Sequence, residues 1–148
     1  MLAHYGFIVT LLWIGFVLAL SFLEAPLKFQ APSVTTPIGL EIGHLVFHAL
    51  NRIEWLFTIL IGVSLYFVVP SNRIIFVALV ILMILIVQTV LLFGPLDTRT
   101  LAIINGETVP EAAYHLYYIA FEVIKLLTLA YFTYLQIQAF QQAVLLNG

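Results

Sequence analysis

The sequence contains no cysteine, which excludes disulfides, thiolate metal sites and cysteine nucleophiles. Charge is almost as scarce, since Asp, Glu, Lys and Arg make up only 8% of the 148 residues. A soluble domain of this size exposes much of its surface and is about a quarter charged. The composition therefore excludes a soluble enzyme and a disordered regulator. The net charge is −2 and no basic run is present, so no nucleic-acid partner is expected.

Apolar side chains are abundant instead, at 64% of the residues, and the mean hydropathy is +1.16. Four stretches reach the roughly 20 residues that a membrane-spanning helix needs: residues 5–23, 44–69, 74–93 and 114–140. We therefore predict an all-α, integral membrane four-helix bundle. The whole chain, residues 1–148, is predicted to form one transmembrane domain.

Local signals extend two of these helices. Helix two is predicted to begin near residue 37, because Thr36-Pro37 is typical of an N-cap followed by a first-turn proline. Helix four is predicted to begin near residue 109, where residues 108–111 form a capping box. The turn-forming residues 70–73 predict that spans two and three are an antiparallel hairpin.

Other signals are interpreted as helix ends. Glu24 is expected to end helix one, and Gly94-Pro95 is expected to end helix three. Asp97 is then interpreted as the cap of a short helix that closes at Asn105-Gly106. Asp97 and Arg99 could instead form a loop site, but a helix cap with a solvated Arg99 is the simpler interpretation.

Positive charges in the loops predict the orientation in a cell inner (plasma) membrane. Lys28 and Arg99 lie in the loops between spans 1–2 and 3–4, and Arg52 and Lys125 lie in helix starts on the same side. The opposite side has Arg73 alone. The sequence therefore predicts that loops 1–2 and 3–4 are cytoplasmic and that both termini lie outside.

Most polar residues of the predicted spans lie toward this same end of the bundle. The set comprises Glu24, Glu41, His44, His48, Asn51, Arg52, Glu54, Gln88, Thr89, His115, Glu122 and Lys125. Charged groups in a membrane turn inward, pair, or move to the interface. Glu122 and Lys125 are three residues apart and can pair within one helix, whereas Arg52 and Glu54 are expected to find partners on other helices.

The histidines of this cluster are candidate metal or haem ligands. His44 and His48 are four residues apart, so a helix places both rings on one side, where they can bind a metal or bracket a haem. If the polar stripes face inward, His115, Glu24 and Glu122 would complete a nitrogen and oxygen ligand set suited to Zn, Fe or Cu(II). Two histidines at this spacing also occur by chance at an amphipathic helix start.

Two resemblances accompany these patterns. Residues 21–29 and 45–54 resemble segments of uncharacterised four-span bacterial membrane proteins of the domain-of-unknown-function type. Asn51-Arg-Ile-Glu54 is similar to the Asn-x-x-Glu pattern in helix two of the microsomal glutathione transferase superfamily. That resemblance implies a glutathione site containing Asn51 and Glu54, and Arg52 lies between them as a further candidate cofactor-binding residue. The sequence departs from that superfamily at residues 47–49 and in helix three, which has no charge.

The sequence supports two different functions. The first is an accessory or structural subunit of a membrane complex or homo-oligomer, whose partners are the lipid bilayer and other membrane subunits or itself. The second is a membrane enzyme or cofactor binder, in which His44, His48, His115, Glu24 and Glu122 act on a metal, a haem or a lipid-soluble substrate. A transporter is disfavoured, because the polar residues do not continue across the bilayer.

Overall fold

The structure is a computed structural model that describes residues 6–68, 70–109 and 114–147. Helices and short turns account for these residues, and no strand occurs among them. Four helices are long and apolar enough to cross a membrane, by length and composition. The predicted all-α fold with four long helices is therefore confirmed.

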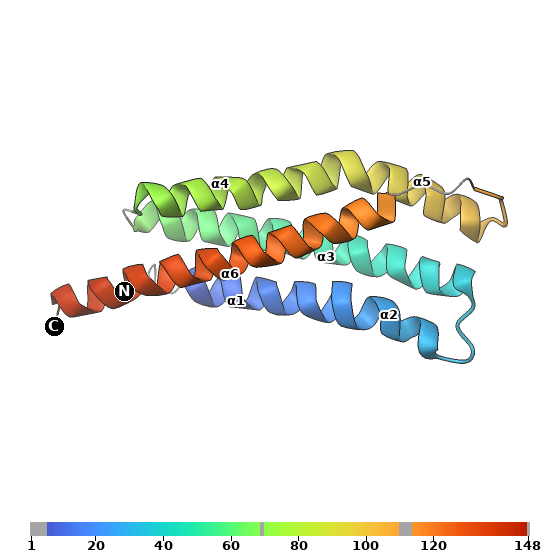
Figure 1. Cartoon of the computed structure of the whole chain (residues 1–148), viewed down its shortest axis with the longest axis horizontal. Helices are drawn as coiled ribbons and strands as arrows, with labels where there is room; N and C mark the ends of the chain where they lie inside the picture. The colour runs from blue at the N-terminus through green and yellow to red at the C-terminus, as the bar shows by residue number, and fades with distance from the viewer. Residues whose placement is uncertain (1–5, 69, 110–113, 148) are drawn as a thin grey trace.

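The four long helices run side by side along the long axis of the molecule (Figure 1). The first contains α1 (Gly6–Val17), the π-helical segment η2 (Leu18–Glu24), α2 (Ala25–Leu27) and the 3₁₀ turn η3 (Lys28–Gln30). The second is α3 (Thr36–Phe67). The third contains α4 (Asn72–Val87), the π-helical segment η4 (Gln88–Leu92) and α5 (Phe93–Ile104). The fourth is α6 (Tyr114–Asn147).

Two predicted helix ends are wrong. The first long helix continues past Glu24, and the third continues through Gly94-Pro95, so that Asp97 lies inside α5 and caps nothing. A proline normally breaks a helix, because its ring clashes with the carbonyl group four residues earlier. That carbonyl group lies within a π-helical segment for both Pro26 and Pro95. The wider turns of these segments give the proline rings room and allow each helix to continue.

The other predicted ends agree more closely with the structure. α3 begins at Thr36, and its N-cap is Thr35, one residue before the predicted cap. Ser71 is the N-cap of α4, which confirms the tight hairpin between α3 and α4. Asn105 ends α5, and Gly106 follows with φ of 80°, a left-handed conformation that glycine adopts without strain. The predicted capping box of helix four extends to residues 110 and 111, which lie outside the described residues.

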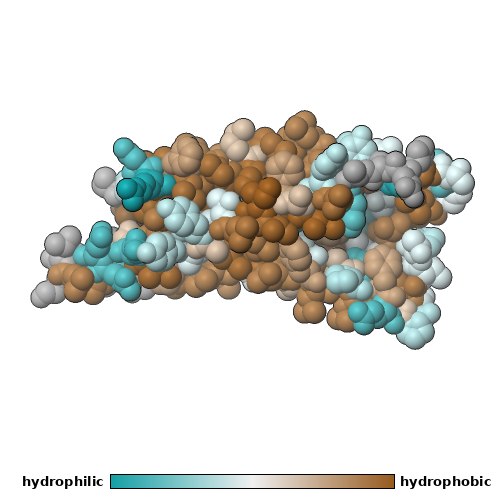
Figure 2. All heavy atoms as spheres, viewed as in Figure 1, coloured by the Kyte–Doolittle hydropathy of each residue, from teal (hydrophilic) through white to brown (hydrophobic). Residues whose placement is uncertain are grey.

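The helices enclose an apolar core. α1 packs against both α3 and α6, while α4 packs against α6 and α5 packs against α3. The largest group of buried apolar residues comprises Trp13, Val17, Leu50, Phe57, Ile61, Ile74, Val77, Ile81, Leu85, Leu129 and Phe132. On the face shown in Figure 2, hydrophobic residues also cover the middle of the surface, and hydrophilic residues gather toward both ends of the long axis. An apolar surface of this kind matches a lipid environment rather than water.

Candidate functional site

A fully buried ion cluster joins three of the long helices. We call Glu54, Gln88, Glu122 and Lys125 the lysine cluster. The Lys125 ammonium group forms ion pairs with the carboxylates of Glu54 on α3 and of Glu122, the latter with Nζ–Oε1 of 2.7 Å. It also donates to Oε1 of Gln88, at 2.9 Å, and Nε2 of Gln88 donates to Oε1 of Glu122, at 2.8 Å. The two pairings predicted from the sequence are confirmed: Glu122 pairs with Lys125, and Glu54 has its partner on another helix.

Two more side chains bind this cluster from the first long helix. The indole N–H of Trp13 donates to Oε1 of Glu54 at 2.9 Å, and the Ser21 hydroxyl donates to Oε2 of Glu122 at 3.4 Å. Glu54 and Glu122 are 1% exposed and Lys125 is not exposed at all. The polar groups are thus held by one another, which is the arrangement that makes buried charge tolerable in an apolar interior.

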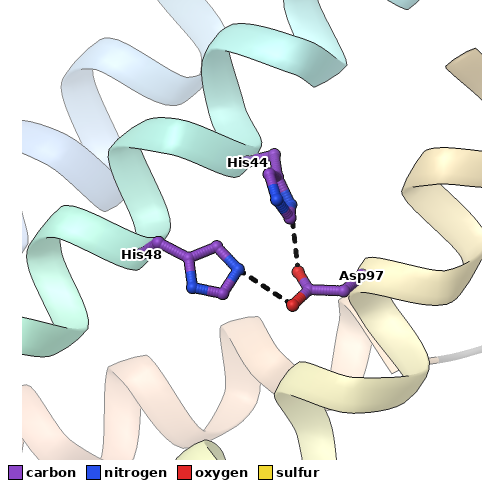
Figure 3. Close-up of side chains that lie close together, drawn as sticks. All are labelled: His44, His48 and Asp97. Atoms are coloured by element: carbon purple, nitrogen blue, oxygen red, sulfur yellow. Dashed lines mark hydrogen bonds and ion pairs between the residues drawn. The ribbon is translucent and has the colours of Figure 1, made fainter.

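A second polar group lies nearer to the end of the bundle. We call His44, His48 and Asp97 the His–Asp group. The two histidines lie one turn apart on α3 and face the Asp97 carboxylate on α5 (Figure 3). Nε2 of His48 lies 2.8 Å from one carboxylate oxygen, and Nδ1 of His44 lies 3.1 Å from the other. These side chains are a quarter to a third exposed, in contrast to those of the lysine cluster.

The His–Asp group has the composition of a transition-metal site. One potential ligand atom from each residue lies within 4.8 Å of the others. The Nδ1 atom of His44 is buried and lacks a hydrogen-bond partner despite its closeness to Asp97. Imidazole nitrogen and carboxylate oxygen are both ligands of Zn²⁺ and of other first-row metal ions. A bound cation would therefore give Nδ1 of His44 a bond in addition to its 3.1 Å contact with Asp97.

A cavity of about 460 Å³ lies between these two polar groups. Segments of all four long helices line it, and both Asp97 of the His–Asp group and Glu122 of the lysine cluster contribute to its wall. Phe22, Phe29 and Phe47 form part of its apolar lining. A cavity of this size with a few convergent polar groups is typical of a small-molecule site.

The structure places the predicted metal ligands in four locations. His44 and His48 lie together, with Asp97 as their carboxylate neighbour. Glu24 pairs with Lys28, at Nζ–Oε2 of 3.2 Å, and Glu122 belongs to the lysine cluster. His115 lines the cavity and is exposed. Metal binding itself stays a prediction, as does haem binding.

The three candidate cofactor-binding residues, of which Asn51 and Glu54 come from the glutathione transferase resemblance, lie in different surroundings. Asn51 donates to the Thr89 hydroxyl at 2.9 Å, while Glu54 is enclosed in the lysine cluster. Arg52 is exposed, and no ion pair joins it to any residue that the structure describes. A glutathione site formed by these residues stays a prediction.

The glycines at the start of α3 accommodate parts of the first long helix. A Cβ atom at Gly39 would overlap the Phe29 ring, and one at Gly43 would lie 2.9 Å from Nζ of Lys28. Lys28 Nζ in turn lies 5.7 Å from the Phe29 ring centre and 5.8 Å from that of Phe47. This pair of glycines therefore receives side chains of the same chain and shapes one wall of the cavity.

The sequence does not indicate Asp97 as a site residue, because Pro95 predicts a helix end that leaves Asp97 at a cap. The helix continues instead, and Asp97 faces His44 and His48. No short motif marks this pairing, since 49 residues separate His48 from Asp97. Comparisons with protein families, with curated proteins and with solved structures find no match for this chain.

Proposed function

We propose that this chain is a multi-pass protein of a cell inner membrane that binds a divalent transition-metal ion through His44, His48 and Asp97. The observation that carries the proposal is the convergence of three potential ligand atoms within 4.8 Å. Two histidines and one carboxylate leave positions free in the coordination sphere of a metal ion, as catalytic and ligand-binding metal sites do.

The uncharged stretch of the third long helix supports a specific depth for this site. Residues 74–93 rise about 30 Å, which is the thickness of the hydrocarbon core. Asp97 then lies about 6 Å outside the core, at the level of the lipid headgroups. Gln88 lies about 7 Å inside it, and the lysine cluster lies at the same depth. The proposed metal site is thus reachable from water, whereas the lysine cluster is not.

The charge around the cavity favours a divalent cation. Asp97 and Glu122 contribute two carboxylates to the cavity wall, and Lys28 contributes one ammonium group. The charge of the lining residues is therefore −1 when the histidines are neutral. The positive-inside tendency of Lys and Arg would place this end on the cytoplasmic side, with loops 1–2 and 3–4.

Metal titration of the purified protein tests the proposal. After treatment with a chelator, the protein in detergent is titrated with Zn²⁺ by calorimetry and with Co²⁺ by visible absorption. We expect one ion per chain, and a loss of at least about tenfold in affinity for His48→Ala and for Asp97→Asn. Failure of wild-type protein to bind either ion would overturn the proposal.

Two control variants separate the structure-based ligand set from the one that the sequence indicates. His115→Ala removes a histidine that lines the cavity but lies outside the His–Asp group, so we expect wild-type affinity. Glu107→Gln removes an exposed carboxylate and is the matched control for Asp97→Asn. A strong loss in His115→Ala with none in Asp97→Asn would favour the ligand set without Asp97.

Arg52 favours a second candidate function, an accessory or structural subunit of a membrane complex or homo-oligomer. Its side chain is exposed on α3 in a stripe with Leu45, Leu56 and Ile59, which are 66%, 53% and 60% exposed. At the proposed depth Arg52 lies about one turn inward of His48, near the edge of the hydrocarbon core, where a carboxylate of a neighbouring subunit would stabilise it. Native mass spectrometry of wild type, Arg52→Lys and Arg52→Leu tests this: only Arg52→Leu should lose a bound subunit. A monomer in all three would contradict it.

A further inference from the structure

The cavity has an aromatic wall that the metal site does not use. Phe22, Phe29, Phe47, Phe93 and Tyr118 all line it. The Tyr118 ring makes edge-to-face contacts with those of Phe47 and Phe93, at centroid distances of 5.4 Å and 5.9 Å. Aromatic side chains pack favourably against further rings in offset or edge-to-face arrangements. The wall therefore suits a flat aromatic ring better than an aliphatic chain.

The inner end of the cavity presents a hydrogen-bond acceptor. Oε1 of Glu122 receives Lys125 and Gln88 at 2.7 Å and 2.8 Å, whereas Oε2 receives the longer bond from Ser21, at 3.4 Å. A carboxylate offers about four acceptor positions over its two oxygens. The Tyr118 hydroxyl is a further hydrogen-bond partner of Glu122, so a hydroxyl group that enters the cavity would replace the long Ser21 bond at Oε2.

The sides of the cavity include exposed apolar residues through which a tail could leave. Phe22, Phe29 and Ile119 line the cavity and are 37%, 45% and 39% exposed. They belong to the first and fourth long helices, and at the proposed depth they border the headgroup region and the upper hydrocarbon core. An apolar tail would continue from here into the bilayer without crossing a polar barrier.

We propose that the cavity binds an amphipathic molecule whose headgroup is a hydroxylated aromatic ring. The ring lies among the aromatic side chains, one hydroxyl donates to Oε2 of Glu122, and the apolar tail leaves past Phe22 and Ile119. A second ring oxygen on the opposite side faces His44 and Asp97, where it becomes a metal ligand; that contact alone rests on the proposed metal site. The carboxylates disfavour an anionic headgroup.

Binding of 2-decyl-1,4-hydroquinone to the purified, metal-free protein in nanodiscs tests the inference. We expect one molecule per chain, and no competition from decylbenzene, which has the same ring and tail but no hydroxyl group. Glu122→Gln should weaken binding by about tenfold or more, because a hydrogen bond to a charged acceptor is replaced by one to a neutral amide. Equal binding of decylbenzene and the hydroquinone would overturn the inference.

A cavity-filling pair keeps the test independent of the lysine cluster, should Glu122→Gln fail to fold. Leu96→Trp places an indole in the cavity and should abolish binding. Leu82→Trp makes the same change in a separate apolar groove on α4 and should leave binding intact. Wild-type binding by Leu96→Trp would overturn the inference.

Zinc separates this inference from the proposed function. If both hold, Zn²⁺ tightens hydroquinone binding at least fivefold in wild type, and this tightening is lost in Asp97→Asn. Hydroquinone binding without any zinc binding would support the cavity and overturn the metal site. Zinc binding without hydroquinone binding would support the metal site and overturn the cavity.

Discussion

The two polar groups at one end of the bundle differ in how completely neighbouring side chains satisfy their hydrogen bonds. The lysine cluster is buried and almost every short contact within it joins a donor to an acceptor. The His–Asp group is partly exposed, and Nδ1 of His44 lies 3.1 Å from Asp97 without forming a hydrogen bond. This difference indicates that the first group holds helices together, while the second is available to a ligand. Predictions on each group can test that division.

The largest expected effect is on the lysine cluster. Lys125→Met leaves the carboxylates of Glu54 and Glu122 buried without their cation, which should lower the free energy of unfolding by about 3–5 kcal/mol. Unfolding of the detergent-solubilised protein, followed by circular dichroism, measures it. The triple variant that also carries Glu54→Gln and Glu122→Gln should recover much of the loss. If Lys125→Met alone is as stable as wild type, the cluster does not hold the helices together.

Two tryptophans offer a matched comparison of hydrogen bonds inside and beside the cluster. Trp13→Phe removes the donor to the charged Glu54 and should cost about 1.5–3 kcal/mol. Trp55→Phe removes a 3.3 Å bond to the neutral Thr89 hydroxyl and should cost no more than about 1 kcal/mol. Both values come from the same unfolding assay. Equal losses would show that the charge of Glu54 does not strengthen its hydrogen bond with Trp13.

The glycines of α3 are expected to give a smaller and unequal response. Gly39→Ala meets the Phe29 ring, and we expect a loss of about 1 kcal/mol together with weaker hydroquinone binding. Gly43→Ala meets only the flexible end of Lys28, at 2.9 Å, so it should be nearly neutral. Thermal unfolding and the binding assay measure both effects. A reversed order would contradict this packing of the cavity wall.

Substitutions in the His–Asp group are expected to have small effects on stability. Asp97→Asn and His48→Ala change partly exposed side chains, so each should alter the free energy of unfolding by only about 0.5 kcal/mol in metal-free protein. The same variants should abolish the extra stability that Zn²⁺ gives to wild type. Thermal shift with and without Zn²⁺ measures both quantities. A large loss of stability without metal would assign this group a structural role as well.

The sequence predicts the four long helices well, because continuous apolar stretches separated by turn residues leave few alternatives. Helical spacing also predicts the Glu122–Lys125 pair, since both residues lie on one helix. It cannot predict that Gln88 joins them, because that contact depends on how two helices pack and rotate. The burial of Arg52 and Glu54 could not be predicted either. The two residues are close together on one helix, yet the Arg52 side chain is exposed and the Glu54 side chain is buried.

The wide turn at η4 has a consequence for the phase of the third long helix. Counted at 3.6 residues per turn, Asp97 would lie about 180° around the helix from Gln88. The Phe93 N–H bonds to the Gln88 carbonyl, five residues earlier, so the turn takes up one additional residue. Asp97 consequently stands where residue 96 of an unbroken α-helix would stand, about 100° nearer to the side of Gln88. The additional residue in this turn thus helps to bring Asp97 to the side of the helix on which Gln88 lies. Both polar groups can therefore contribute to the wall of the same cavity.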